Sequence, residues 1–186
     1  MKVKLEKLYK ECLEELKLID IDLDEKIVGK IDISFSKRKT KRYGCCKQEE
    51  PDKSTAYREK KTIHYKKYNK HHIEISKWLM DLNSDIIKNT IIHELIHCLP
   101  NCNNHGKDFK KYCKLINEKL GYNISRLGNK KEDYEKSNLE FKENLKFKYT
   151  IICENCGLIY YRHRLAKNFV RKYRCGKCRG KLRVLN

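Results

Sequence analysis

Three histidines and a glutamate lie within thirteen positions, in the stretch HELIHCLPNCNNHG at residues 93–106, in a chain with seven histidines in all. His93 and His97 are four residues apart, so on a helix their side chains lie one turn apart on one face, close to Glu94. In an HExxH site the two imidazoles bind Zn²⁺, while the glutamate takes a proton from the water that attacks a peptide carbonyl. The stretch therefore predicts a catalytic zinc site with Glu94 as the general base.

An HExxH sequence also arises by chance, and glutamate is common on exposed helices. The neighbouring residues favour the metal site. His93, Glu94 and His97 interrupt an apolar run that predicts a buried helix, where an unpaired polar group costs several kcal/mol in the worst case. Coordination of a metal would give these polar side chains a partner.

A catalytic zinc site usually has three protein ligands and one open position for water. His105 is the expected third ligand, because Pro100 ends the helix, the following turn can bring the chain back, and Gly106 permits a close approach. Glu118 is the rival ligand, as a glutamate supplied by a later helix, and His105 could instead cap a helix. The spacing is not the HExxHxxGxxH of metzincins, which also need a Met-turn downstream.

Four cysteines form a second motif, C-x2-C-x18-C-x2-C, at Cys153, Cys156, Cys175 and Cys178. Two pairs at this spacing are typical of a four-thiolate structural zinc site, which leaves no open position for catalysis. A redox CxxC is the alternative, but neither pair lies in a βαβ pattern. The other cysteines are expected to be small buried apolar residues: Cys12, Cys45, Cys46, Cys98, Cys102 and Cys113.

Aromatic and basic residues alternate between the two cysteine pairs, and residues 146–186 hold 12 Lys or Arg against one acidic residue, Glu154. Rings can stack on exposed bases while cations contact phosphates, a combination used on single-stranded nucleic acids. The alternative is a solvated basic face whose rings form a small core. The expected nucleic-acid contacts are Tyr161, Arg162, Arg164, Lys167, Arg171, Lys172 and Arg174.

The whole chain is basic: 44 Lys and Arg against 25 Asp and Glu give 186 residues a formal charge of +19. Such a charge favours polyanionic partners. The charged beginning of the chain lacks the apolar segment of a secretory signal, and no run approaches the ~18 apolar residues of a membrane span. These features predict a cytoplasmic monomer, associated with a nucleoid or nucleus, that is not secreted and contacts no membrane.

Helices and strands must position these motifs, and their pattern predicts an α+β fold. Apolar residues recur at helical spacing over residues 3–19, 84–97 and 106–120, and Gly121 is the expected C-cap of the last helix.

Alternating apolar residues predict strands at 31–35 and 72–76, with a weaker strand at 58–65. Residues 44–51 contain a glycine and a proline and are expected to be rich in turns.

Changes in composition predict two domains joined by a linker. Residues 1–121 are the expected metallopeptidase core, with helices packed on a small antiparallel sheet. Residues 122–145 are highly charged and read as a linker or exposed helix, and residues 146–186 form a small β zinc ribbon that the metal holds together.

Three motifs in this order resemble the SprT-like metalloprotease family, which includes DNA-dependent proteases. They are TIIHELIH at 90–97, HGKDF at 105–109 and the four-cysteine ribbon that ends in CRGKL at 178–182. The resemblance covers nearly the whole chain and implies a zincin-like core in which His93, His97 and His105 bind zinc and Glu94 is the base. It also implies that residues 73–76 border an extended substrate, and that DNA binding switches on cleavage of proteins crosslinked to DNA.

The main hypothesis is therefore a zinc-dependent endopeptidase with one catalytic and one structural Zn²⁺. It would bind DNA at single-stranded or distorted sites and cleave DNA-bound or crosslinked proteins. A second hypothesis is a non-catalytic zinc-ribbon protein that binds nucleic acid. A third is a metal-dependent nuclease built on the three histidines, which ranks last because a glutamate next to His93 favours peptide hydrolysis.

Overall fold

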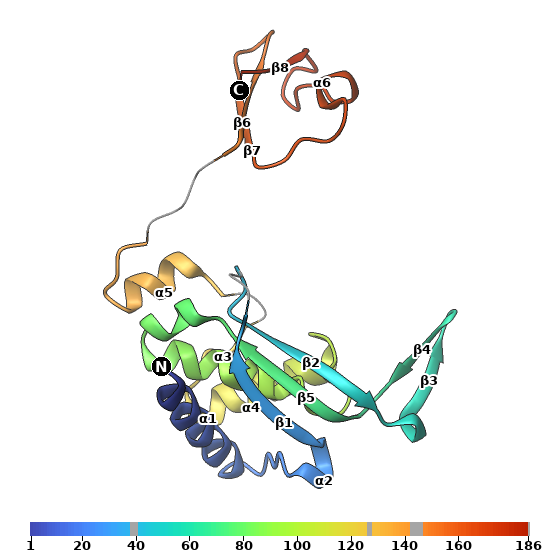
Figure 1. Cartoon of the computed structure of the whole chain (residues 1–186), viewed down its shortest axis with the longest axis vertical. Helices are drawn as coiled ribbons and strands as arrows, with labels where there is room; N and C mark the ends of the chain where they lie inside the picture. Colours follow the sequence, from blue (N-terminus) through green and yellow to red (C-terminus); the bar gives the residue numbers. More distant parts are fainter. Residues whose placement is uncertain (38–40, 126–127, 142–146, 186) are drawn as a thin grey trace. The chain divides into compact units, whose positions relative to one another are not determined.

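The computed structural model of the chain describes residues 1–37, 41–125, 128–141 and 147–185. The chain divides into two compact units, Met1–Phe141 and Lys142–Asn186 (Figure 1). Both helices and small sheets are present, so the fold is mixed α+β. The first unit extends beyond residue 121, where the sequence predicts the end of the core.

Three long helices form the body of the first unit: α1 (Lys2–Lys17), α3 (Ser84–Ile96) and α4 (Lys107–Leu120). They lie within about two residues of the helices expected at 3–19, 84–97 and 106–120. Asn83 caps α3, because its side chain accepts a hydrogen bond from the Asp85 backbone N–H. Gly121 ends α4 in the left-handed conformation, with φ of +71°, which confirms the predicted C-cap.

Shorter helical segments complete the first unit: α2 (Glu25–Val28), η1 (Lys53–Thr55), η2 (Lys77–Asp81) and α5 (Lys130–Lys136). The region expected to be a charged linker contributes to this unit. Ile124 is buried in its core, and Tyr134 of α5 stacks on Trp78 with ring centroids 6.3 Å apart. Residues 126–127 and 142–145 of the expected linker lie outside the described residues.

The main sheet consists of β1 (Lys30–Phe35), β5 (Tyr68–Ile75) and β2 (Gly44–Pro51), in the order β1-β5-β2. The strands expected at 31–35 and 72–76 are confirmed as β1 and part of β5. The prediction of an antiparallel sheet is wrong in one pair. β5 enters between the two earlier strands, so it runs antiparallel to β2 and parallel to β1.

Residues 44–51 form strand β2 rather than the expected turn-rich stretch. The strand pairs with β5 from Gly44 opposite Ile75 to Pro51 opposite Tyr68. It is an edge strand with much of its surface exposed, so its sequence, GCCKQEEP, lacks the apolar alternation of a half-buried strand. Pro51 is tolerated because it stands at the end of an edge strand.

The strand expected at 58–65 is a hairpin of two strands, β3 (Ala56–Glu59) and β4 (Thr62–Tyr65). The chain reverses at Lys60 and Lys61, where Lys60 has a positive φ of 54°. Figure 1 shows that this hairpin projects beyond the ends of β2 and β5.

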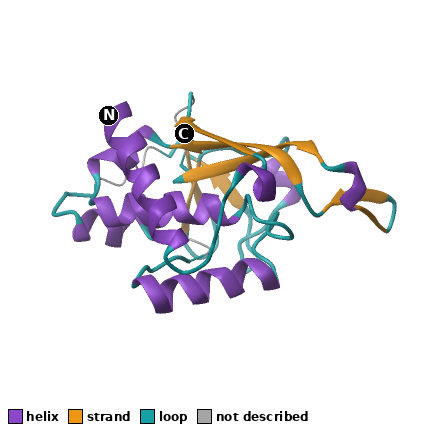
Figure 2. Cartoon of the chain, turned by 90° about the horizontal axis from the view of Figure 1, so that it is seen from below, coloured by secondary structure: helices purple, strands orange, loops and turns teal. Residues whose placement is uncertain are grey.

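The core of the first unit lies between the main sheet and the long helices. In Figure 2 most of the helices lie to one side of the main strands. Ile73 and Ile75 of β5, Ile91 and Leu95 of α3, and Phe109 of α4 are almost completely buried there. Their burial fixes α3 against the sheet, and with it the residues of the HExxH motif.

The second unit contains β6 (Tyr149–Cys153), β7 (Ile159–Arg162), α6 (Phe169–Lys172) and β8 (Leu182–Val184), and its sheet order is β7-β6-β8. All its strand pairs are antiparallel. Within residues 147–185, its buried core consists of Ile151, Leu182 and two cysteines. Such a small core favours stabilisation by a metal.

Candidate metal centres

The three histidines of the first motif form a cluster that could hold a metal ion. One ring nitrogen from each of His93, His97 and His105 lies within 4.8 Å of the other two. The Nε2 atoms of His93 and His105 are 3.0 Å apart. Helix α3 supplies His93, its C-cap residue is His97, and the loop before α4 supplies His105.

The rival ligand Glu118 is not part of the cluster. Its side chain is 61% exposed on α4 and forms an ion pair with Lys114, at 3.7 Å between the charged atoms. The reversal after α3 thus brings His105, rather than Glu118, to the two helical histidines.

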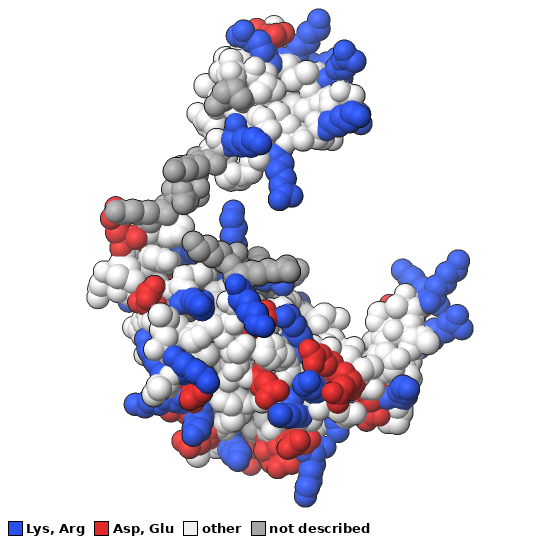
Figure 3. Space-filling view, in the orientation of Figure 1, with Lys and Arg blue, Asp and Glu red and all other residues white. Residues whose placement is uncertain are grey.

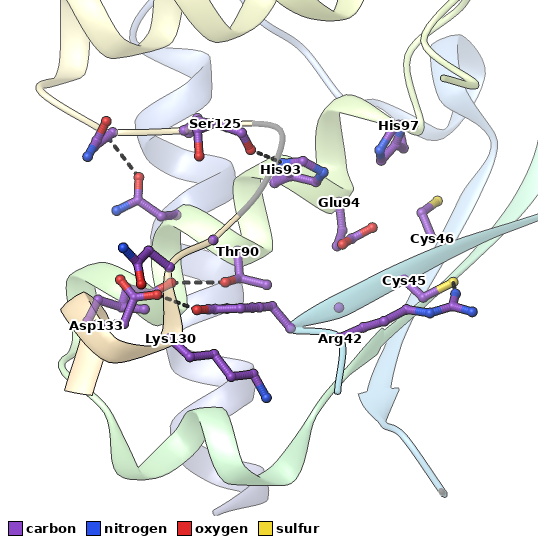
Figure 4. A pocket seen from close by; sticks show the side chains of 18 of the residues that line it. Arg42, Cys45, Cys46, Thr90, His93, Glu94, His97, Ser125, Lys130 and Asp133 are labelled. Carbon is purple, nitrogen blue, oxygen red and sulfur yellow. Dashed lines mark hydrogen bonds between the residues drawn. The ribbon is translucent and has the colours of Figure 1, made fainter. Parts of the chain in front are cut away.

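Backbone carbonyls orient two of the three rings. The Nδ1 of His93 lies 3.0 Å from the Ser125 carbonyl oxygen (Figure 4). The Nδ1 of His97 lies 2.7 Å from the Cys102 carbonyl oxygen. A carbonyl can only accept, so Nδ1 must donate the hydrogen in each case. This tautomer leaves Nε2 free to bind a metal, as is usual for histidine ligands.

Burial also keeps the rings of His93 and His97 uncharged. It lowers the pKa of His93 to about 4, and the neighbouring His97 and His105 lower it further. Burial lowers the pKa of His97 as well. Phe109 packs against all three rings, with centroid distances of 4.7 to 4.9 Å. Near neutral pH the rings of His93 and His97 are therefore in the neutral form that binds metals.

Glu94 lies between α3 and β2, next to the histidines (Figure 4). The residue is only 6% exposed, and burial raises the pKa of its carboxyl to about 7. A hydrogen bond from the Cys46 backbone N–H and the charge of Arg42 oppose this rise. The carboxyl is thus held in place by the edge of β2, and its pKa is suited to both accepting and donating a proton.

A cleft of about 1090 Å³ opens over the histidines and Glu94. Gly44, Cys45, Cys46 and Gln48 of β2 form one wall, and residues of α5 lie at another part of the lining. The Gln48 side chain donates to the His97 carbonyl oxygen at 2.8 Å, which ties this wall to the end of α3. The cleft is large enough for an extended peptide segment.

The strand that borders this cleft is β2, not the one that the resemblance implies. Residues 73–76 fall on and just after β5, which is flanked by β1 on one side and β2 on the other. A peptide therefore cannot pair with β5 there. The edge of β2 faces the cleft, since the Cys46 N–H reaches Glu94.

The four cysteines of the second motif form a separate cluster, in which all four sulfurs lie within 4.8 Å of one another. Cys153 and Cys178 are 3.4 Å apart, and Cys156 and Cys175 are 3.6 Å apart. These distances exceed an S–S bond of ~2.05 Å, so the thiols are free. Four sulfurs in this arrangement could hold a metal ion.

Polar groups and a glycine adapt the cluster to sulfur ligands. The Tyr160 hydroxyl lies 3.0 Å from the Cys175 sulfur and lowers the pKa of that thiol to about 6. The Gly180 N–H donates to the Cys178 sulfur at 3.4 Å. A Cβ at Gly180 would lie 2.6 Å from the Asn155 Cβ, so glycine is required. The hydrogen bonds to Cys175 and Cys178 favour their thiolates, the form that binds metals.

None of the remaining cysteines joins a metal-binding group within the described ranges. Cys12, Cys98, Cys102 and Cys113 are buried, whereas Cys45 and Cys46 are half-buried at the cleft.

The seven residues expected to contact nucleic acid are all exposed on the second unit. Tyr161 is 49% exposed and stacks on Phe147 with centroids 5.1 Å apart. Arg174 has a structural role, because one of its nitrogens donates to the carbonyls of Val170, Arg171 and Tyr173. Its guanidinium is thus partly occupied at the end of α6.

Sequence reasoning missed the groups that support the two clusters. The carbonyls of Ser125 and Cys102 and the amide of Cys46 are backbone atoms, which every residue carries, so no sequence signal identifies them. The sequence indicates Gly44 only as a residue of an expected turn, and Tyr160 only as one of several aromatic residues between the cysteine pairs. Neither signal predicts the contacts that these two residues make.

Helix α3, with its histidine cluster, and the distinct four-cysteine cluster define a protein with two potential metal centres. The model of the SprT-like family matches residues 12–128, more than half of the chain. The chain belongs to the SprT-like family, which is broadly a metalloprotease-like family. The match includes all three histidines and ends before the four cysteines.

Two curated relatives carry the same description. The chain is 60% identical over 37 residues to Protein SprT-like of Lactococcus lactis, which covers 20% of this chain and 24% of that protein. It is 32% identical over 114 residues to Protein SprT-like of Oceanobacillus iheyensis, which covers 59% of this chain and 65% of that protein. The chain thus spans less than two thirds of the length of either relative. No solved structure matches it.

Among the residues that the structure describes, no helix has the length and apolar character needed to cross a bilayer.

Proposed function

We propose that this chain is a zinc-dependent endopeptidase that binds DNA and cleaves proteins bound or crosslinked to it. The observation that carries the proposal is the meeting of His93, His97 and His105 beside the buried Glu94 in one cleft. Membership of the SprT-like family supports it.

Both clusters fit zinc. Three neutral imidazoles with one open position are a usual donor set for catalytic Zn²⁺, and four thiolates are a usual set for structural Zn²⁺. When bound at the histidines, the metal would polarise the scissile carbonyl and acidify a water molecule.

The residues of the chain supply the proton transfers. Glu94 accepts a proton from the attacking water on a carboxylate oxygen and then gives it to the leaving amine nitrogen. The Cys46 N–H orients the Glu94 carboxyl. Glu94 is only 6% exposed, so most bulk water is excluded from it. An extended peptide would pair its backbone with the edge of β2, which places the scissile bond beside Glu94.

Binding of DNA is assigned to the second unit. It exposes one aromatic ring and five cations, a combination that suits single-stranded or distorted DNA: Tyr161, Arg162, Arg164, Lys167, Arg171 and Lys172. Such binding would bring DNA-bound proteins to the peptidase cleft. We place this activity inside the cell, where DNA-bound proteins occur.

The test uses the full chain loaded with zinc and a basic DNA-binding protein as substrate, with and without single-stranded DNA. We expect the wild type to cleave the substrate faster with DNA. Glu94→Gln should lose activity by at least ~10²-fold, because it removes the general base, while zinc content measured by mass spectrometry stays unchanged. Glu118→Gln is the matched control on an exposed helical face and should retain full activity.

Cleavage by Glu94→Gln at the wild-type rate would refute the assigned mechanism. If the wild type binds zinc at both clusters and binds DNA, but never cleaves protein, the non-catalytic nucleic-acid-binding hypothesis would replace it. Cleavage of naked DNA that depends on the three histidines would instead identify a nuclease.

A further inference from the structure

The β3–β4 hairpin and its base, residues 53–67, form a basic projection on the first unit. Its six basic residues stand against one acidic residue, Glu59; they are Lys53, Arg58, Lys60, Lys61, Lys66 and Lys67. Figure 3 shows Lys and Arg side chains gathered at the end of this projection. The projection is far from the ribbon cysteines in sequence and belongs to the unit that carries the histidine cluster.

Four basic residues of this projection have no acidic partner in the part of the chain that the structure describes. Among the described residues, no ion pair includes Lys53, Arg58, Lys60 or Lys61. By contrast, Lys88 on α3 pairs with two glutamates of α1, at 2.9 and 2.8 Å. The hairpin charges are therefore available to an anionic partner.

The turn itself is unfavourable for its sequence. Lys60 adopts a φ of +54°, a conformation that glycine or asparagine takes at lower cost. A strained residue suggests a role beyond folding. In this turn the strain places two adjacent lysines, Lys60 and Lys61, at the outermost point of the hairpin.

The faces of the hairpin are largely uncovered. Tyr57 stacks on His64 across the strands with ring centroids 5.6 Å apart, yet Tyr57 remains 43% exposed. Ile63 is 60% exposed. An isolated pair of strands is only marginally stable in water, so a bound partner would stabilise it.

The base of the hairpin is connected to the metal-site loop. The Asn103 side chain donates to the Tyr65 carbonyl oxygen at 2.8 Å, and the Asn101 N–H donates to the Lys66 carbonyl oxygen at 3.0 Å. Between these two asparagines lies Cys102, whose carbonyl orients His97. The base of the hairpin is therefore hydrogen-bonded to the same loop that orients His97.

We propose that the β3–β4 hairpin is a second nucleic-acid-binding surface, which docks on duplex DNA. The inference extends the proposed DNA binding and rests on it. A two-stranded β-hairpin fits the major groove of DNA, which is ~12 Å wide, and lysines at the tip of the hairpin can contact the phosphates on either side. The hairpin would thus bind duplex DNA on the unit that carries the histidine cluster.

The test measures binding of the full chain to labelled duplex DNA by fluorescence anisotropy over a range of salt concentrations. The variant Lys60→Asn with Lys61→Asn removes both charges, and asparagine tolerates the left-handed conformation at position 60. The matched control, Lys110→Gln with Lys111→Gln, removes the same charge from exposed positions on α4. Circular dichroism and zinc content would confirm that each variant is folded.

We expect the hairpin variant to bind duplex DNA about tenfold more weakly at ~0.1 M salt, and the control to change less than about twofold. The slope of log Kd against log salt should fall by about 1.8, at about 0.9 per phosphate contact. Arg58→Gln, on a strand rather than in the turn, should weaken binding in the same direction. Equal losses in hairpin and control variants, or an unchanged slope, would overturn the proposal.

Two further arms separate this proposal from its alternatives. If polyglutamate or anionic lipid vesicles compete as well as DNA at equal charge, the surface recognises another polyanion and the nucleic-acid assignment fails. Arg171→Gln with Lys172→Gln tests the ribbon surface. If only this ribbon variant loses DNA binding, the proposed function stands and the hairpin inference fails. If the two surfaces contribute separately to DNA affinity, a variant with both pairs of substitutions should lose affinity by the product of the two separate fold-losses.

Discussion

Gly44 on β2 lies directly against the carboxyl of Glu94 on α3. A Cβ added at Gly44 would lie 2.8 Å from Oε1 and 2.9 Å from Cγ of Glu94. Both distances are shorter than ordinary contacts, so a larger residue must displace the carboxyl or the strand. The absence of a side chain at this position is therefore what allows the edge strand to approach the proposed base.

Gly44→Ala should reduce peptide hydrolysis by about tenfold or more, because a displacement of about 1 Å at a catalytic group can cost ~10²-fold. Zinc content should not change, since the three atoms nearest to the added Cβ all belong to Glu94, which is not a member of the histidine cluster. Steady-state cleavage of a protein substrate, with zinc measured in the same sample, checks this. The control is Cys45→Ala, at the next position on the cleft wall. Equal activity of Gly44→Ala and the wild type would contradict the prediction.

His105→Ala should weaken zinc binding at the first cluster by more than ~100-fold. Loss of a residue that only supports a ligand costs up to ~100-fold, and His105→Ala removes a ligand itself. Glu118→Ala should leave zinc affinity unchanged, since that side chain is 61% exposed and outside the cluster. Competition with a chelator of known affinity measures both. A larger effect from Glu118→Ala than from His105→Ala would reverse the assignment.

Tyr160→Phe should weaken zinc binding at the cysteine cluster by about tenfold. The lost hydroxyl lies 3.0 Å from the Cys175 sulfur and also accepts from the Gly176 N–H at 3.1 Å. The rate of zinc release to a coloured chelator is the readout. Tyr173→Phe is the control on the same unit, where the ring is 50% exposed. Identical release from both variants would exclude a role for the Tyr160 hydroxyl.

His71 should make the first unit less stable in mild acid. It is 1% exposed in the central strand β5, and burial lowers its pKa to about 4, which the nearby Val28 backbone opposes only in part. The unfolded chain, with a histidine pKa of ~6.5, binds the proton more readily than the folded chain. The contribution of neutral His71 to the free energy of unfolding is therefore complete above pH ~6.5. It is lost as the pH falls toward 4, by up to ~1.4 kcal/mol per pH unit.

His71→Leu should flatten this pH dependence of stability. Neither ring nitrogen makes a hydrogen bond of ordinary geometry in the described part of the chain, so leucine leaves no new unpaired group. Urea unfolding at pH 5 and pH 8, compared between variant and wild type, checks the slope. His64→Leu, on the exposed hairpin, is the control and should leave the slope unaltered. Equal slopes for His71→Leu and wild type would show that His71 is not the titrating group.

Local patterns predicted most of the first unit. Helix α3 was predicted because its apolar residues are continuous and Pro100 limits its end, and α4 because of its apolar spacing and Gly121. The strand β2 was missed because an exposed edge strand needs no apolar alternation. The hairpin was read as one strand because its turn uses two lysines instead of asparagine and glycine.

By itself, the sequence determined the chemistry: the HExxH spacing, a histidine after the helix, four paired cysteines and a large positive charge. These features depend on residue type and on separations along one element, which local geometry fixes. The tertiary structure decided what depends on distant segments. It brought His105 rather than Glu118 to the histidine cluster and placed Gly44 against Glu94. It also placed the carbonyls of Ser125 and Cys102 within hydrogen-bond distance of the histidine rings. Such contacts arise from packing between elements, and no spacing along the chain encodes them.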